Sequence, residues 1–183
     1  AQEAMAGQSR GGSSGSSGSP ARGIADIPDP QGRGGYVSDP DGLLSEATVR
    51  AINSMLRNDM GSVGGMQVAI ILVKHLKDDL GIGALSRLLM DRWGVGDRNR
   101  NTGVIYTNAL LDRRHYLYAG AGVKHDLHKP AREVILARAQ TRLRDGKVDE
   151  AVMGVVKDVI FQVKWEPYRR KLRRLLLLVL AVG

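Results

Sequence analysis

Apolar residues recur with helical spacing in four parts of the chain. In residues 46–57, Val49, Ile52 and Leu56 fall on one helical face, and Ser45 before them is a residue type that caps helix N-termini. Glycines interrupt the pattern soon after this segment. We expect three further helices around the apolar sets Leu85, Leu88, Leu89 and Trp93; Ile135, Ala139 and Leu143; and Val148, Val152, Val155 and Val159.

Two continuous apolar runs predict buried strands. Residues 67–75 read Gln-Val-Ala-Ile-Ile-Leu-Val-Lys-His, and an unbroken β-branched run of this kind is typical of a strand covered on both faces. Residues 103–110 form a second such run, and a tight turn at residues 112–114 leads into a third strand at residues 115–119. Strands therefore alternate with helices, with one hairpin. This order predicts an α/β fold, namely a three-layer α/β/α sandwich with a mixed sheet.

Composition separates a tail from this domain. Residues 1–35 are rich in Gly, Ser, Pro and Gln, and their few apolar side chains cannot offset the entropy cost of ordering the segment. We therefore expect a flexible tail over residues 1–35 and a folded domain over residues 36–163. The chain contains no cysteine, which excludes disulfides and thiol catalysis.

Residues 164–183 carry a third pattern. Two aromatic residues come first, then a basic block, then nine apolar residues. Aromatic and basic residues favour the membrane interface, and a full span needs roughly 20 apolar residues. We interpret the segment, set off by Pro167, as a basic juxtamembrane stretch and the start of a transmembrane helix; the alternative is an amphipathic helix packed on the domain or on a partner. The expected membrane-interface residues are Trp165, Tyr168, Arg169, Arg170, Lys171, Arg173 and Arg174.

The distribution of charge supports a lipid partner over a nucleic acid. The net charge is +8, yet residues 36–163 hold 18 basic and 15 acidic side chains. Residues 164–174 hold six basic side chains and one acidic one, so most of the excess lies beside the apolar run. A basic block in that position is typical of binding to anionic lipid headgroups. We expect no nucleic-acid partner.

Few residues form a pattern typical of a catalytic or metal site. The four histidines lack the spacing of a zinc motif, and neither a phosphate-binding lysine loop nor a nucleophile-elbow serine occurs. The remaining candidates are aspartates in turns, at positions 39, 41, 97 and 112. Clustered loop carboxylates bind hard cations such as calcium or magnesium, whereas single aspartates more often form the turn itself. Both alternatives stay open on spacing alone.

The order of several short motifs resembles that of the TPM domain family, also called the photosystem II repair or TPM phosphatase family. The motifs are Tyr-Val-Ser-Asp at residues 36–39, Asp-Arg-Trp-Gly-Val-Gly at 91–96, Asn-Thr-Gly-Val-Ile at 101–105, Asp-Arg-Arg at 112–114 and Gly-Ala-Gly-Val at 120–123. The resemblance implies an exported α/β/α domain, periplasmic or lumenal, that is often followed by a transmembrane helix. It also implies assistance to photosynthetic membrane complexes in some members and acid phosphatase activity with a divalent metal in others.

Two aspartates match the family's motifs. The resemblance makes Asp39, of the opening motif, and Asp112, of the hairpin, candidate ligands for calcium or magnesium. We expect a non-catalytic, membrane-anchored accessory subunit or an assembly or repair factor that binds a membrane protein complex, of the photosynthetic kind. The alternative is a divalent-metal-dependent acid phosphatase. Basic residues before a span favour a cytoplasmic domain, but the resemblance favours export, and we expect the periplasmic or lumenal side.

Overall fold

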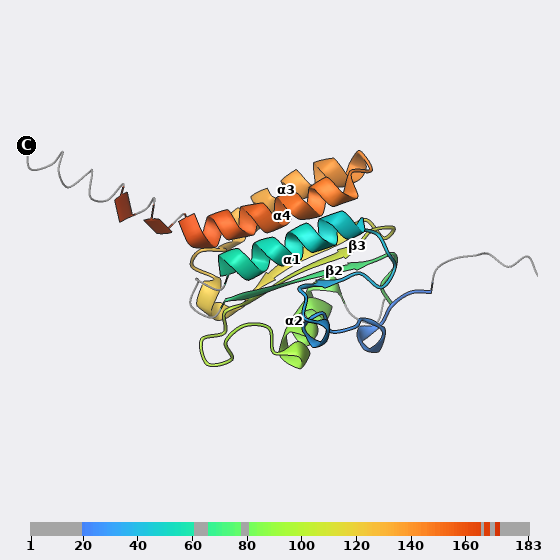
Figure 1. Cartoon of the computed structure of the whole chain (residues 1–183), viewed down its shortest axis with the longest axis horizontal. Coiled ribbons are helices and arrows are strands. Elements are labelled where there is room, and N and C mark those ends of the chain that lie inside the picture. Colours follow the sequence, from blue (N-terminus) through green and yellow to red (C-terminus); the bar gives the residue numbers. More distant parts are fainter. Residues whose placement is uncertain (1–19, 61–65, 78–80, 166, 169–170, 173–183) are drawn as a thin grey trace, which may run out of the picture.

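A four-stranded mixed sheet forms the centre of the computed structural model, which describes residues 20–60, 66–77, 81–165, 167–168 and 171–172. The strands lie in the order β1-β2-β3-β4, and the two central strands, β2 and β3, are labelled in Figure 1. The first three are parallel, and β4 is antiparallel to β3, as the predicted hairpin requires. Their bounds are Val37–Ser38 for β1, Gln67–Val73 for β2, Gly103–Ala109 for β3 and Arg114–Ala119 for β4.

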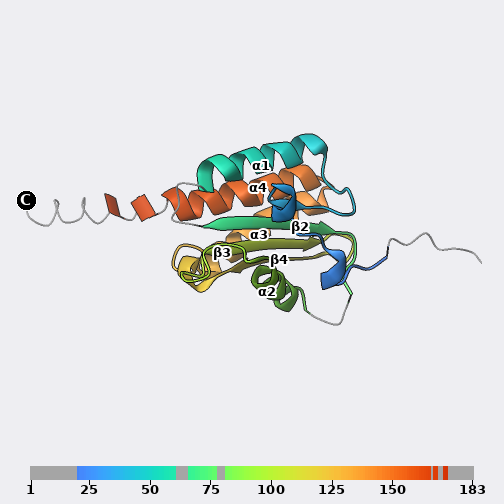
Figure 2. The ribbon, with the colours of Figure 1, turned by 60° about the horizontal axis from the view of Figure 1, so that its bottom comes forward.

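Helices cover both faces of this sheet. Three of them, α1, α3 and α4, lie on one face, and α2 lies on the other (Figures 1 and 2). Two separate hydrophobic cores result, one on each side of the sheet. The predicted α/β fold with a mixed sheet between helical layers is confirmed. The helices are Glu46–Met60 for α1, Ile82–Trp93 for α2, Lys129–Arg144 for α3 and Val148–Ile160 for α4.

Strand β2 shows why the sequence forms this sandwich. Val68, Ile70 and Leu72 alternate along the strand and pack into the core under α1, α3 and α4. Ala69 and Ile71 point the other way, into the core under α2. All five are fully buried, and burial of each larger side chain stabilises the fold by roughly 1.5–3 kcal/mol. The prediction of a strand buried on both faces is therefore confirmed.

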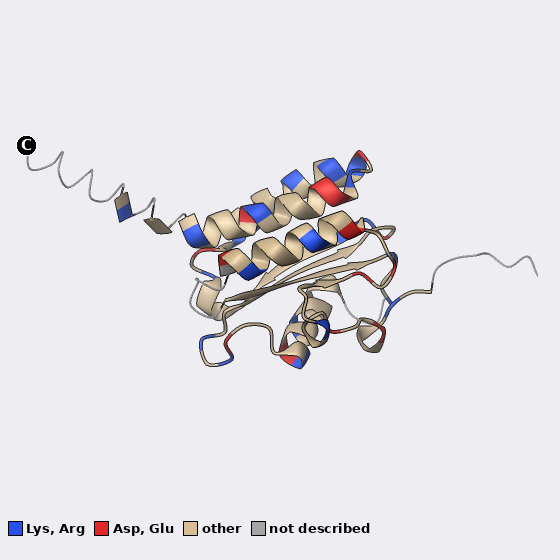
Figure 3. Ribbon diagram, viewed as in Figure 1, with Lys and Arg blue, Asp and Glu red and all other residues tan. Residues whose placement is uncertain are grey.

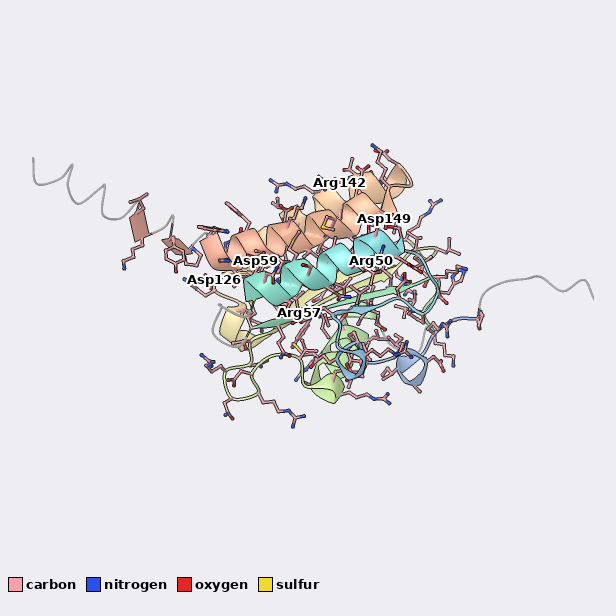
Figure 4. All side chains as sticks on the ribbon, viewed as in Figure 1. Arg50, Arg57, Asp59, Asp126, Arg142 and Asp149 are labelled. Carbon is pink, nitrogen blue, oxygen red and sulfur yellow. The ribbon has the colours of Figure 1, made fainter. Side chains whose placement is uncertain are left out.

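Helices α1 and α4 run side by side in the same direction and are joined at both ends. At their starts, the Ser45 backbone N–H donates to the Asp149 carboxylate at 3.0 Å. At their ends, the Lys164 Nζ donates to the Asp59 carboxylate at 2.8 Å. Asp149 and Asp59 lie near opposite ends of α1 in Figure 4. Figure 3 shows both basic and acidic residues on the exposed surface of α1, α3 and α4.

The ordered domain begins earlier than the sequence predicts. Residues 20–35 were expected to belong to the flexible tail, but Arg22 forms a parallel bridge with Leu76, just past β2. Ile27 is only 3 % exposed and belongs to the core under α2. Two short 3-10 turns, Ile24–Asp26 and Gln31–Arg33, carry the segment along the domain. Two isoleucines three positions apart, Ile24 and Ile27, were too weak a signal to outweigh the surrounding Gly and Pro.

The C-terminal segment also differs from expectation. The last helix was expected over residues 148–163, but α4 ends at Ile160 and a π-helical turn, Phe161–Trp165, follows. Pro167 was expected to separate the domain from the basic segment, yet Pro167 and Tyr168 are helical, as are Lys171 and Leu172. Within the described residues, no helix is long and apolar enough to cross a membrane. Four predicted interface residues and the apolar run lie outside that part of the chain: Arg169, Arg170, Arg173, Arg174 and residues 175–183.

Candidate functional site

The loops that follow β1, β2 and β3 meet at one edge of the sheet. All three strands are parallel, so their carboxyl ends point the same way. In open α/β sheets, ligands bind outside the carboxyl ends of the strands. This edge holds Asp39 and Asp41 after β1, His75 after β2 and Asp112 after β3, and it therefore contains both predicted metal ligands.

Asp39 organises its own loop. One carboxylate oxygen accepts the Leu43 N–H at 2.9 Å, and the other accepts the Leu44 N–H at 2.8 Å. Both bonds hold the turn that leads from β1 into α1, as expected of an aspartate that forms a turn. A cavity of about 420 Å³ lies beside it, lined also by Arg33, Glu46 and Arg50.

Asp41 is the most tightly held carboxylate of this edge. One oxygen accepts the Lys74 backbone N–H at 2.8 Å, and the other is 2.6 Å from the Arg22 Nη2. The side chain is only 4 % exposed. Burial opposes ionisation, but the Lys74 N–H and the Arg22 guanidinium outweigh it and hold the pKa of Asp41 below its ordinary value. Asp41 thus joins the end of β2 to the segment that precedes β1.

Asp112 makes a second connection to the end of β2. Its Oδ1 is 2.7 Å from the His75 Nδ1, and its Oδ2 accepts the Leu76 N–H at 2.8 Å. The Arg114 Nη2 also donates to Oδ2, at 3.3 Å. Burial raises the pKa of Asp112, and the Leu76 N–H, His75 and Arg114 together lower it further than burial raises it, so the net shift is downward.

The two predicted ligands therefore lie at the same edge of the sheet but stabilise different connections: Asp39 holds its own loop, and Asp112 binds the residues that follow β2. The end of β2 lies between the loops of Asp39 and Asp112, and each carboxylate binds backbone N–H groups of the protein. Among the residues that the structure describes, no three His, Asp or Glu side chains lie close enough to hold a metal ion. Metal binding at Asp39 and Asp112 stays a prediction. Sequence reasoning named Asp41 only as one of four loop aspartates and could not find its partner Arg22.

The glycine-rich motifs of the sequence serve backbone packing. Gly96 has a φ of +85°, and a Cβ atom there would overlap the backbone of Gly103. A Cβ on Gly122 would overlap the carbonyl oxygen of Arg100 in the same way. Asp97, between them, accepts the Arg100 N–H at 3.1 Å and is thereby a turn former. The loop at residues 97–102 thus packs directly on the sheet, and Gly is needed where backbones touch.

A second cavity, of about 590 Å³, lies between the β3–β4 turn and the corner that joins α3 to α4. Two of its lining residues, Asn108 and His115, are linked through the buried Tyr106: the Asn108 Nδ2 donates to the Tyr106 hydroxyl at 3.4 Å, and that hydroxyl lies 3.2 Å from the His115 Nδ1. Burial raises the pKa of Tyr106 and lowers that of His115, so both groups are neutral near pH 7. The sequence did not reveal this cavity, whose polar lining is Asn108, Arg113, Arg114, His115, Gln140 and Arg144.

Solved structures with the same fold come from three bacteria. The N-terminal domain of a protein from P. gingivalis has a TM-score of 0.69 and 24 % identity, and the match covers 81 % of this chain and 96 % of that one. The N-terminal domain of the cg2496 protein from Corynebacterium glutamicum has a TM-score of 0.56, 12 % identity and coverage of 71 % and 80 %. The BA42 protein from Bizionia argentinensis has a TM-score of 0.55, 13 % identity and coverage of 68 % and 84 %.

At these identities the solved structures show a shared fold and nothing of function. No curated protein matches the chain. The family model of the TPM domain, however, matches residues 37–162, which spans the whole sheet and all four α-helices. That match agrees with the order of motifs from the opening Tyr-Val-Ser-Asp to the hairpin, and the chain therefore belongs to the TPM domain family.

Proposed function

We propose that this protein is a membrane-anchored accessory module that presents its α/β domain to a membrane protein complex as an assembly or repair factor. The observation that supports it most is the exposure of Trp165 and Tyr168, at 52 % and 70 %, on the segment that leaves α4. Large aromatic side chains that are exposed in water are stabilised at a membrane interface. The basic residues that follow in the sequence suit anionic headgroups.

The start of this anchor is attached firmly to the domain. The Lys164 Nζ pairs with Asp59 at the end of α1 and also lies 5.7 Å from the centre of the Trp165 ring. The rings of Trp165 and Tyr168 lie 6.5 Å apart. A fixed exit direction would hold the domain at a set orientation to the membrane, which suits a factor that must meet one surface of a large complex. The periplasmic or lumenal side and a photosynthetic partner are parts of the proposal that rest on the family alone.

Vesicle flotation of the full chain tests the anchor. We expect binding to vesicles that contain phosphatidylglycerol, weaker binding to pure phosphatidylcholine, and a loss of binding in the double variant Trp165→Ala/Tyr168→Ala. Leu88→Ala, which removes an exposed apolar side chain from the opposite face of the sheet, is the matched control and should float like the wild type. Equal flotation of the double variant and the wild type would remove the aromatic anchor from the proposal.

A pull-down from detergent-solubilised membranes tests the partner. The proposal expects a membrane protein recovered in stoichiometric amount with the tagged chain. Recovery of the chain alone, at a salt concentration that leaves its vesicle binding intact, would contradict the accessory role while leaving the anchor in place.

The divalent-metal-dependent acid phosphatase stays a second candidate because three carboxylates lie at the carboxyl edge of the parallel strands. Phosphoryl transfer requires cations placed on the phosphate oxygens. Hydrolysis of p-nitrophenyl phosphate, measured with and without added magnesium or calcium, should fall in Asp39→Asn and Asp112→Asn if these residues hold the metal. The exposed Asp91 supplies the control Asp91→Asn. Activity that both variants retain would reject the roles of Asp39 and Asp112.

A further inference from the structure

We propose that the cavity between the β3–β4 turn and the α3–α4 corner binds a small organic anion, which has an anionic head group with acceptor oxygens and an apolar body of alkyl or aryl carbon. Arg113 and Arg144 would bind the head, and neighbouring leucines the body. This site goes beyond the accessory role, because that role depends on the C-terminal segment, and none of the described residues that line the cavity belongs to that segment.

The cavity is built from two parts of the chain that are distant in sequence. Residues 108–115 supply one wall, and residues 140–148, which end α3 and begin α4, supply the other. Its volume, about 590 Å³, falls within the range of roughly 300–1,000 Å³ that is typical of small-molecule sites. That size suits a compact molecule and is too small for a folded partner.

The charge of the lining is of one sign. Arg113, Arg114 and Arg144 all contribute, and none of the described residues that line the cavity is acidic. Arg114 is paired with Asp112, which faces the sheet edge. The guanidinium groups of Arg113 and Arg144 form no hydrogen bond or ion pair within the described part of the chain. Like charges around one cavity repel each other, and a bound anion offsets that cost.

The backbone at Arg113 gives an independent reason to assign a role to its side chain. Its φ is +54°, in the left-handed region that favours Gly or Asn. An arginine in that conformation costs about 1–2 kcal/mol, and such strain is frequent at functional sites. The Arg113 N–H donates to the Leu110 carbonyl at 3.2 Å, so the turn itself needs no side chain at this position.

Besides the arginines, the lining residues Asn108 and His115 supply hydrogen-bond donors. The buried Tyr106 hydroxyl accepts from Asn108 and must donate its own proton, and the His115 Nδ1 is the acceptor beside it. We therefore assign the neutral His115 tautomer with hydrogen on Nε2, which makes the imidazole a donor. Guanidinium, imidazole N–H and amide groups together match the acceptor oxygens of a carboxylate, sulfonate or phosphate.

The remaining lining is apolar and sets the second half of the ligand. Leu111 is 56 % exposed at the rim, and Leu143 and Val148 line the opposite wall. Burial of their surface by an alkyl or aryl group is favourable at about 25 cal/mol per Å². An inorganic ion would leave this surface in water, so the ligand is an organic anion.

Calorimetric titration of the full chain with octanesulfonate tests the site, since this probe cannot be hydrolysed. We expect saturable one-to-one binding, much weaker binding of methanesulfonate, and none of the neutral octyl glucoside. Arg113→Gln and Arg144→Gln should each weaken octanesulfonate binding about tenfold, which corresponds to roughly 1.4 kcal/mol. Arg87→Gln removes the same charge from an exposed position on α2 and should bind like the wild type.

Two results would overturn the proposal. One is equal affinity of Arg113→Gln, Arg144→Gln and Arg87→Gln for octanesulfonate at matched ionic strength. That result would mean that binding depends only on the net charge of the protein and not on this cavity. The other is methanesulfonate as tight as octanesulfonate, which would remove the apolar half. Circular dichroism and the unfolding midpoint of each variant distinguish a lost site from a lost fold. The vesicle test of Trp165 and Tyr168 is separate, so either proposal can fail alone.

Discussion

Asp112 and Arg113 are neighbours in sequence, yet the Asp112 carboxylate is paired with other groups of the protein and the Arg113 guanidinium is not. Asp112 lies at the carboxyl edge of the sheet, where His75, the Leu76 N–H and Arg114 bind it from three sides. Arg113 lines the second cavity, and its guanidinium forms no hydrogen bond or ion pair with the described residues. At the sheet edge, charged side chains therefore connect loops of the protein to one another. In the cavity, by our proposal, the arginine side chains are available to bind a ligand.

The largest effect that separates the two regions is on stability. Asp41→Ala would leave the Lys74 N–H and the Arg22 guanidinium without their acceptor at a site where the side chain is 4 % exposed. Loss of an acceptor from a buried donor costs about 1–3 kcal/mol, and we expect a decrease of about 2–3 kcal/mol in the free energy of unfolding. Urea denaturation followed by circular dichroism measures it.

Asp91→Ala is the control for that experiment. Asp91 is exposed on α2, and substitutions at such positions usually change stability by less than about 0.5 kcal/mol. A decrease in Asp41→Ala no larger than in Asp91→Ala would mean that the pairing at the edge is not structural, and the contrast with the cavity would disappear.

Acid titration should reveal the two regions at different pH values. The pKa of Asp112 is lowered on folding, so its contribution to stability is complete above the unfolded value of about 3.9 and is lost as the pH falls through the folded pKa. The pKa of His115 is lowered by burial, so its contribution is complete above about 6.5 and declines as the pH falls below that value. The unfolding free energy of the wild type should therefore decline in two steps on acidification.

Two variants assign these steps. His115→Asn, whose amide oxygen can accept from Tyr106, should flatten the step that begins near pH 6.5. Asp112→Asn should make the step below about pH 4 smaller without removing it, because the pKa of Asp41 is lowered on folding as well. Urea titrations across this range supply the data. If His115→Asn kept the upper step, the imidazole would not be the group that titrates in the cavity.

Much of the fold was predictable because its signals are local. The apolar runs of β2 and β3 are each contiguous, and the hairpin turn lies between adjacent strands. The alternation of strands and helices along the chain was therefore enough to predict the α/β/α sandwich. Strand β1 has two residues, Val37 and Ser38, and gains its place only by pairing with Ile70 and Ile71. Such a short strand carries no periodicity of its own.

The sites were harder to predict because their partners are distant in sequence. Asp41 pairs with Arg22 and with the Lys74 backbone, 33 residues further along the chain, and neither partner is recognisable from spacing. The second cavity likewise appears only when the end of α3 packs beside the β3–β4 turn. By contrast, Asp39 acts within five residues of itself, and its turn role was visible as one of the two alternatives.

The smallest effect on stability should come from the cavity, and it should have the opposite sign. Arg113→Gly replaces an arginine at a φ of +54° by the residue that adopts this conformation freely. Relief of the backbone strain offsets the greater entropy of glycine in the unfolded chain, so we expect the free energy of unfolding to stay equal or to rise by up to about 1 kcal/mol.

The same substitution should abolish the tight binding of octanesulfonate. Arg113→Gln, which keeps the strained backbone but removes the charge, separates the two effects: it should weaken binding without the gain in stability. Urea denaturation and calorimetry on both variants give the answer. If Arg113→Gly instead lowers the free energy of unfolding by about 1 kcal/mol or more, Arg113 would stabilise the fold as Asp41 does. The distinction between paired charges at the sheet edge and unpaired charges in the cavity would then have to be withdrawn.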